Sequence, residues 1–110
     1  MTTYSLYLTV DFYNDVKSIV NYVKKDSFAN AKMLADEIKK SVVSLSEMPK
    51  MHQEAREIDK YEMLTGLDLR QIICKNHRIV YLIKDETVFV LGVFSCRQNS
   101  MEFTKISEYL

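Results

Sequence analysis

Three residues in the second half of the chain could do chemistry on a phosphodiester. Arg78 stands directly before an apolar run, Arg97 follows another, and His77 precedes Arg78. A guanidinium is permanently charged, and its fork of N–H donors matches phosphate oxygens. An imidazole can act as a general acid or base near neutral pH. Together these side chains could hold a phosphate and move a proton.

The same residues also have an ordinary structural interpretation. An arginine at a strand end can lay its stem on apolar surface and keep its charged head in water. His77 lies beside a predicted turn, where a histidine is normally a surface residue. Tyr81 is expected in the core, with its hydroxyl bonded at an edge. Residue types alone leave both interpretations open.

The first half of the sequence predicts a strand followed by a helical hairpin. Residues 4–10 alternate loosely and are rich in Tyr, Leu and Thr, as in a short strand. Asp11 is a candidate N-cap for an amphipathic helix of about 14 residues. Ser27 is a second N-cap candidate, for a helix that Pro49 would end. Because so few residues separate the two helices, they are expected to pack antiparallel.

The second half predicts a meander of strands. Residues 49–66 show no sustained period and are expected to form an irregular, mobile connection. Three strand segments follow, and residues 101–110 could form a last helix. The strand segments are 67–74, 78–83 and 87–94, and the turn candidates between them are 75–76 and 85–86.

The predicted fold class is therefore α+β. It comprises an N-terminal strand, an α-helical hairpin, an antiparallel three- to four-stranded sheet and a short C-terminal helix. The strands are apolar on both faces, so both faces of the sheet need a cover. The second cover would be the terminal helix or a partner chain.

Strand register decides which candidate side chains share a face. A tight turn between the last two strands places Arg78 opposite Val93, and Arg97 then points to the same face. These arginines would lie about 13 Å apart along the strand at ~3.3 Å per residue, which long side chains can span. A tight turn between the preceding strands places Arg70 opposite Tyr81, facing the other way.

The totals fit a single domain spanning residues 1–110. Fifteen basic residues balance fifteen acidic ones, so bulk charge does not favour nucleic-acid binding. Cys74 and Cys96 are expected to be reduced thiols, and neither a metal site nor a cofactor is predicted. No glycine-rich phosphate loop or catalytic-serine motif occurs. Without a targeting segment or a long apolar run, the chain is expected to be soluble and cytoplasmic, with no membrane partner.

The order of strand, helical hairpin, loop and meander resembles the RelE/ParE family of toxins from bacterial type II toxin–antitoxin modules. The resemblance covers nearly the whole chain and is carried by short motifs. These are Arg70 in the second strand, His77 and Arg78 with Tyr81 three residues further on, the charged turn 84–86, Arg97 after the last strand, and the helix end 45–49.

This resemblance implies a small toxin that a cognate antitoxin neutralises by folding a disordered segment over the toxin's helices and sheet. RelE-like members of the family cut messenger RNA on the ribosome with basic and aromatic side chains rather than a metal. ParE-like members lack that set and poison DNA gyrase.

Position by position, the RNase set is incomplete in this chain. Arg78 and Arg97 match arginines of that set, but Phe103 falls where RelE has a tyrosine, so its ring could stack but could not transfer a proton. The lysines that RelE carries in the second strand are missing, since the corresponding stretch has Leu69, Gln71 and Ile73. A neutral chain also departs from the basic character expected of a ribosome-dependent RNase.

Three hypotheses follow, and the first is favoured. The chain is a ParE-like toxin that inhibits gyrase by protein binding, with no enzymatic activity. Alternatively, it is a metal-independent endoribonuclease in which Arg78 and Arg97 clamp phosphate and His77 transfers a proton. In the third hypothesis it is an inactive member kept as a binding module. The residues expected to face the target or the antitoxin are Arg70, Arg78, Tyr81, Arg97 and Phe103.

Overall fold

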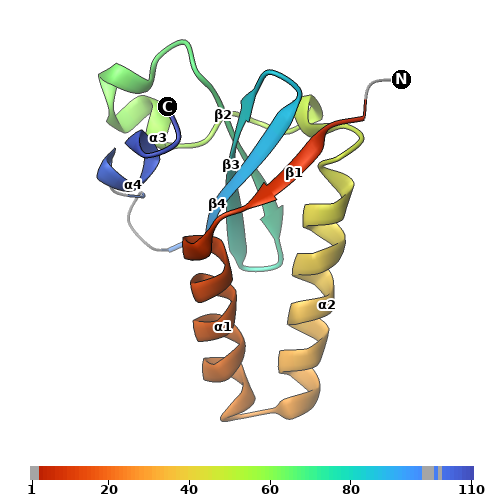
Figure 1. Cartoon of the computed structure of the whole chain (residues 1–110). Helices are drawn as coiled ribbons and strands as arrows, with labels where there is room; N and C mark the ends of the chain where they lie inside the picture. The colour runs from red at the N-terminus through yellow and green to blue at the C-terminus, as the bar shows by residue number, and fades with distance from the viewer. Residues whose placement is uncertain (1–2, 98–100, 102) are drawn as a thin grey trace.

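The computed structural model describes residues 3–97, 101 and 103–110, which form three layers (Figure 1). A four-stranded sheet lies in the middle, a helical hairpin covers one face, and short helices cover the other, so the predicted α+β fold class is confirmed. No helix in this described part is both long and apolar enough to cross a membrane. The elements in chain order are β1 (Ser5–Leu8), α1 (Val10–Lys24), α2 (Phe28–Ser44), η1 (Pro49–Met51), α3 (Glu57–Lys60), η2 (Glu62–Leu64), β2 (Asp68–Cys74), β3 (His77–Lys84), β4 (Thr87–Ser95) and α4 (Phe103–Ser107).

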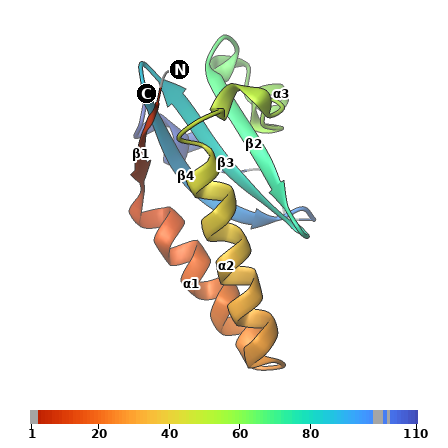
Figure 2. The ribbon, with the colours of Figure 1, turned by 90° about the vertical axis from the view of Figure 1, so that its right-hand side faces the viewer.

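The helical hairpin packs antiparallel and projects beyond the end of the sheet (Figure 2). Ser27 caps α2 as predicted, because its hydroxyl oxygen accepts a backbone N–H of the first turn. The N-cap of α1 is Thr9 rather than Asp11, which lies in the first turn. The Thr9 hydroxyl accepts from the Phe12 N–H and donates to the Val90 carbonyl of β4, so it joins the helix start to the sheet.

The sheet is mixed, with the strand order β1-β4-β3-β2. Strand β1 pairs parallel with β4, while the meander β2-β3-β4 is antiparallel. Both predicted turns form, and Lys75 and Asp85 adopt left-handed φ angles of 56° and 58° there. The predicted pairing of Arg70 with Tyr81 is also confirmed.

The predicted pairing of Arg78 with Val93 is wrong by one residue. Arg78 lies opposite Phe94, because β4 contains one extra residue, Leu91, in a β-bulge. A bulge shifts every pair beyond it, so a register counted outward from the turn fails from this point on.

Asp15 and Gly92 hold the bulge in place. The Asp15 carboxylate of α1 accepts the Val93 N–H at 3.1 Å, which satisfies a backbone donor beside the irregularity. Burial raises the pKa of Asp15, against the opposing effect of this hydrogen bond. Gly92 leaves room for the contact, since a Cβ there would lie 2.7 Å from Asp15 Oδ2. The bulge therefore depends on packing between α1 and β4.

The connection over residues 49–66 contains short helices, so its prediction as an irregular segment is wrong. It forms η1, α3 and η2, and it buries Ala55, Glu57 and Leu64. The Ala55 N–H donates to the Leu69 carbonyl at 2.9 Å, which pairs the segment with the edge of β2. Together with α4, this segment supplies the second cover that the apolar strands require.

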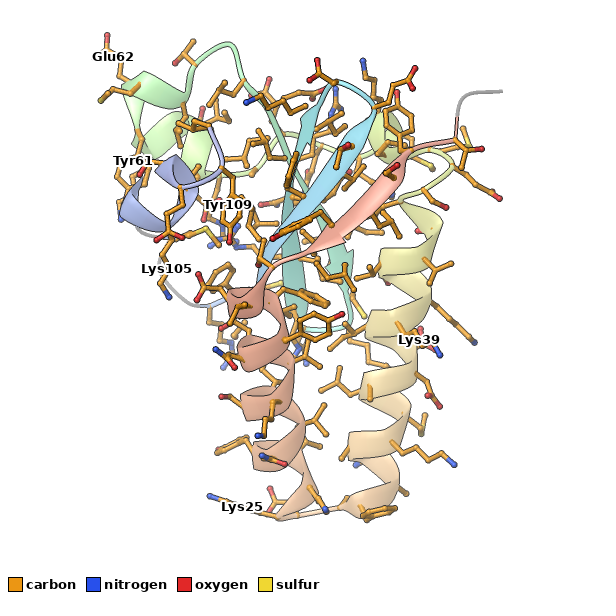
Figure 3. All side chains as sticks on the ribbon, viewed as in Figure 1. Lys25, Lys39, Tyr61, Glu62, Lys105 and Tyr109 are labelled. Atoms are coloured by element: carbon orange, nitrogen blue, oxygen red, sulfur yellow. The ribbon has the colours of Figure 1, made fainter. Side chains whose placement is uncertain are left out.

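The C-terminal residues close the same layer. Tyr109 lies against the sheet (Figure 3), with its ring centroid 6.5 Å from that of Tyr7 in β1 and 6.2 Å from that of Phe89 in β4. Ile106 is fully buried. The end of the chain is thus anchored by aromatic and aliphatic packing.

Candidate functional site

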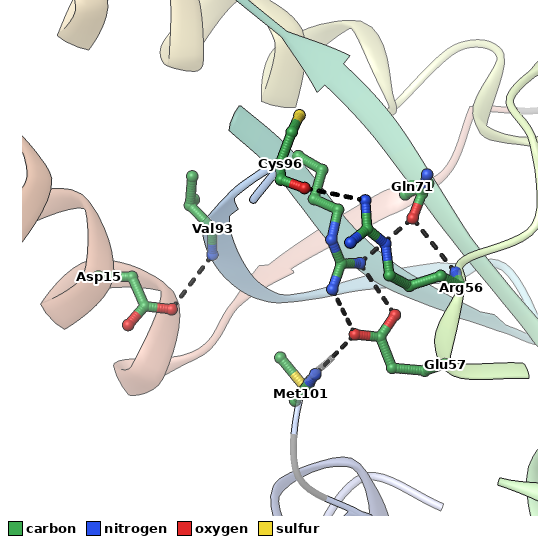
Figure 4. A network of polar contacts seen from close by, with 8 residues as sticks. Asp15, Arg56, Glu57, Gln71, Val93, Cys96 and Met101 are labelled. Atoms are coloured by element: carbon green, nitrogen blue, oxygen red, sulfur yellow. Dashed lines mark hydrogen bonds and ion pairs between the residues drawn. The ribbon is translucent and has the colours of Figure 1, made fainter. Parts of the chain in front are cut away.

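Arg78 is fully buried, so the expectation that its charged head reaches water is wrong. Its Nη1 donates to Glu57 Oε1 at 2.9 Å and its Nη2 donates to Glu57 Oε2 at 2.6 Å (Figure 4). Both side chains are 0% exposed. The pair is therefore bidentate and internal, and it joins β3 to the first residue of α3.

Further hydrogen bonds extend this pair into a network. Gln71 Oε1 of β2 accepts from Arg78 Nη1 and from the Arg56 N–H, each at 3.2 Å. The Met101 N–H donates to Glu57 Oε2 at 2.7 Å (Figure 4). Glu57 thus ties three parts of the chain together: α3, the sheet and the segment that leads to α4.

The network favours the charged form of Glu57. Burial alone raises the pKa of Glu57, but the hydrogen bonds from Arg78 and the Met101 N–H, and the charge of Arg78, lower it below its usual value. The Phe94 ring centroid lies 5.4 Å from the Arg78 Cζ and adds a cation–π contact. Each charge is neutralised inside the protein, and neither is presented to solvent.

His77 and Arg78 lie on opposite faces of the sheet, because successive residues of a strand alternate. His77 borders a hollow on the hairpin side, together with Val23 and Met33. Burial lowers the pKa of its imidazole, and its Nδ1 has no hydrogen-bond partner among the described residues. The structure does not bring this candidate proton carrier near Arg78.

Arg70 and Tyr81 share the hairpin side and hold the segment that follows α2. Arg70 pairs with Asp68 at 2.6 Å, and its Nη1 donates to the His52 carbonyl at 2.6 Å. Tyr81 is fully buried and its hydroxyl donates to the Pro49 carbonyl at 2.6 Å, so the prediction of a core tyrosine with a bonded hydroxyl is confirmed. Burial also raises the pKa of Tyr81.

Arg97 lies in the turn that follows β4 and is exposed. The prediction that it shares a strand face with Arg78 is therefore wrong, since β4 ends at Ser95. Phe103 begins α4, but its side chain lies outside the described residues. Among the candidate arginines, Arg97 is the most exposed, the Arg70 side chain is 24% exposed, and Arg78 is buried.

Sequence comparison places the chain in a family. The family model of the ParE toxin of the type II toxin–antitoxin system parDE matches residues 6–100. The chain belongs to the ParE toxin family. No curated protein sequence matches it significantly.

Solved structures of toxin–antitoxin proteins are similar to this ParE-family chain. A chain of the chromosomal ParDE system of P. aeruginosa has a TM-score of 0.65 and 14% identity, covering 86% of this chain and 98% of its own. A mutant of the E. coli toxin RelE in the free state has a TM-score of 0.64 and 17% identity, covering 98% of this chain and 99% of its own. A chain of the RelBE2 toxin–antitoxin complex of Mycobacterium tuberculosis has a TM-score of 0.58 and 16% identity, covering 84% of this chain and 98% of its own. At these identities the likeness shows the shared fold.

The ParE-family chain also carries an open apolar groove of about 680 Å³ between α1, α2 and β1. The exposed side chains of Tyr13 and Val43 contribute to its lining, and Lys17 and Lys39 are its charged residues. The other lining residues are Leu6, Leu8, Phe12, Asn14, Val16, Val20, Asn21, Ala35, Ile38 and Val42.

The sequence pattern missed two features of this site. Glu57 looked like one more solvated carboxylate, although Ala55, Ile58 and Tyr61 around it mark one apolar side of a short helical segment. The groove was missed because an apolar helix stripe has the same sequence pattern whether it packs on a sheet or lines an open groove. Among the described residues, no group of three or more potential metal ligands occurs.

Proposed function

We propose that this ParE-family toxin inhibits DNA gyrase by binding it as a protein, and that a cognate antitoxin neutralises it. The observation that carries the proposal is the pairing of Arg78 with Glu57. A phosphodiester-cleaving site needs several side chains that converge on one phosphate. Here the Arg78 guanidinium is already paired with Glu57, and His77 faces the other side of the sheet.

The charge of the chain supports the same proposal. Affinity for RNA comes largely from neutralising phosphates, and this chain has a formal net charge of zero. A toxin that acts on a protein surface needs no such excess of positive charge.

Purified gyrase provides the test. Gyrase is incubated with relaxed plasmid, ATP and increasing toxin, and the topoisomers are separated on agarose gels. We expect supercoiling to fall as toxin is added and to recover when the cognate antitoxin is added first. Full supercoiling at saturating folded toxin would contradict the proposal.

The ribonuclease alternative has its own readout. Primer extension on cellular messages after induction would show codon-linked cuts if the toxin were RelE-like, and we expect none. Normal growth with abundant folded protein would instead favour an inactive binding module.

We further propose that the antitoxin docks an amphipathic segment in the groove between α1, α2 and β1. The groove is almost entirely apolar, and its charged residues, Lys17 and Lys39, are both basic. An amphipathic helix or strand with acidic residues flanking its apolar face would complement this surface.

Val43→Asp tests the docking proposal with Met33→Asp as its matched control. Both residues lie on α2 and both are 56% exposed, but Val43 lines the groove and Met33 does not. We expect Val43→Asp to weaken antitoxin binding at least tenfold, which is about 1.4 kcal/mol, and Met33→Asp to leave it unchanged. Equal affinity of the two variants in a titration would place the antitoxin elsewhere.

A further inference from the structure

The Glu57 carboxylate is held in the way that proteins hold a bound oxoanion. Oε1 accepts from Arg78 Nη1 at 2.9 Å, and Oε2 accepts from Arg78 Nη2 at 2.6 Å and from the Met101 N–H at 2.7 Å. A guanidinium fork combined with a backbone N–H is a common arrangement for binding carboxylates and phosphates. Here the anion comes from the chain itself.

Other contacts of Arg78 do not depend on Glu57. Gln71 Oε1 accepts from Nη1 at 3.2 Å, and the Phe94 ring packs over the guanidinium at 5.4 Å. These partners come from β2 and β4, so the sheet itself orients the guanidinium. Arg78 Nε is buried without a hydrogen-bond partner among the described residues, so the guanidinium also keeps an unused donor.

We propose that Arg78 and the Met101 N–H form an oxoanion-binding site that the chain fills with its own Glu57 carboxylate. A carboxylate or phosphate ligand then reaches Arg78 only when the Glu57 side chain is absent or α3 moves away from the sheet. With its carboxylate bound to Arg78 and the Met101 N–H, Glu57 positions α3 against the segment before α4. The inference concerns an internal site and is independent of the toxin's target.

Glu57→Ala tests the proposal because it removes the carboxylate and leaves the space that it occupied. Thermal unfolding is followed at pH 7 in sodium formate, sodium phosphate or sodium chloride at equal ionic strength. The wild-type protein and the double variant Glu57→Ala/Arg78→Leu serve as controls, because the first has its site filled and the second has no cation to bind an anion.

We expect the unfolding midpoint of Glu57→Ala to lie below that of the wild type and to rise with formate and with phosphate. A ligand that binds only the folded state raises the midpoint with the logarithm of its concentration, and a rise of about 4 °C or more is expected at saturating formate. Chloride should have a smaller effect. Phosphate stabilises folded proteins in general, so the wild type and the double variant should match each other in each salt, and the additional rise of Glu57→Ala measures the site.

Several outcomes would overturn the proposal. An equal response of Glu57→Ala to chloride, or a formate response of the double variant as large as that of Glu57→Ala, would mean that the stabilisation does not come from an anion bound at Arg78. If formate raises the unfolding midpoint of Glu57→Ala and phosphate does not, the proposal that the site binds phosphate is wrong. If Glu57→Ala does not fold in chloride, its refolded fraction in formate is measured by circular dichroism, and a failure to recover contradicts the proposal.

Discussion

Arg78→Met should destabilise the fold far more than a surface substitution. The variant leaves the Glu57 carboxylate buried without its cation, with backbone N–H groups such as that of Met101 as donors. Removing one partner of a buried ion pair costs about 3–5 kcal/mol, because the other charge stays in a low-dielectric environment. Loss of the cation–π contact with Phe94 contributes to the same cost.

A double variant separates the value of the pair from the cost of an orphaned charge. Arg78→Met/Glu57→Leu has no buried charge at this position, and apolar replacements of a buried pair are often neutral or stabilising. The Met101 N–H loses its acceptor, which costs about 1–3 kcal/mol. We therefore expect the double variant to be more stable than Arg78→Met and somewhat less stable than the wild type.

Urea unfolding followed by circular dichroism measures these differences, with Arg97→Met as the control. Arg97 is exposed, so its substitution should change stability by no more than about 0.5 kcal/mol. A deficit below about 1 kcal/mol for Arg78→Met would refute the buried pair as a major stabilising contact.

The pH dependence of the deficit supplies a second check. The lowered pKa of Glu57 means that its contribution to wild-type stability is present above its usual pKa of 4.5 and is lost as the pH falls through the lowered value. Without Arg78, burial dominates and raises the pKa of Glu57, so protonation relieves the variant as the pH falls. The deficit should therefore be smaller at pH 5 than at pH 7, and a constant deficit would contradict this account.

Further substitutions test the other contacts by the same unfolding assay. Thr9→Val removes the cap of α1 and should cost about 0.5–2 kcal/mol, and no loss would mean that the cap is unimportant. Tyr81→Phe leaves the Pro49 carbonyl without its donor and should cost about 1–3 kcal/mol, whereas wild-type stability would exclude a contribution from that bond. Gly92→Ala forces a Cβ to within 2.7 Å of the Asp15 carboxylate and should cost about 1–3 kcal/mol, unless the bulge rearranges freely.

Local sequence patterns were sufficient for most of the fold. Ser27 caps its helix through a bond within one turn, and residues 75–76 and 85–86 form turns between adjacent strands. Such features depend on neighbours in the chain, so the sequence records them directly. The parallel pairing of β1 with β4 joins segments about 80 residues apart, and the local pattern did not indicate it.

The errors at the candidate site arose from contacts between distant residues. The β-bulge depends on Asp15, which is 78 positions from the backbone N–H that it accepts. The burial of Arg78 depends on Glu57, which is 21 positions away in a charged segment without clear period. A carboxylate that neutralises a buried arginine and one that faces water look the same in a sequence.

The most direct test of the toxin's action compares DNA topology and message integrity in the same cells. The toxin is induced without its antitoxin, and the supercoiling of a reporter plasmid and the 5′ ends of abundant messages are measured over the first minutes. A gyrase inhibitor predicts progressive loss of negative supercoils while the messages stay intact. Codon-linked cuts in the messages with unchanged plasmid supercoiling would contradict this account.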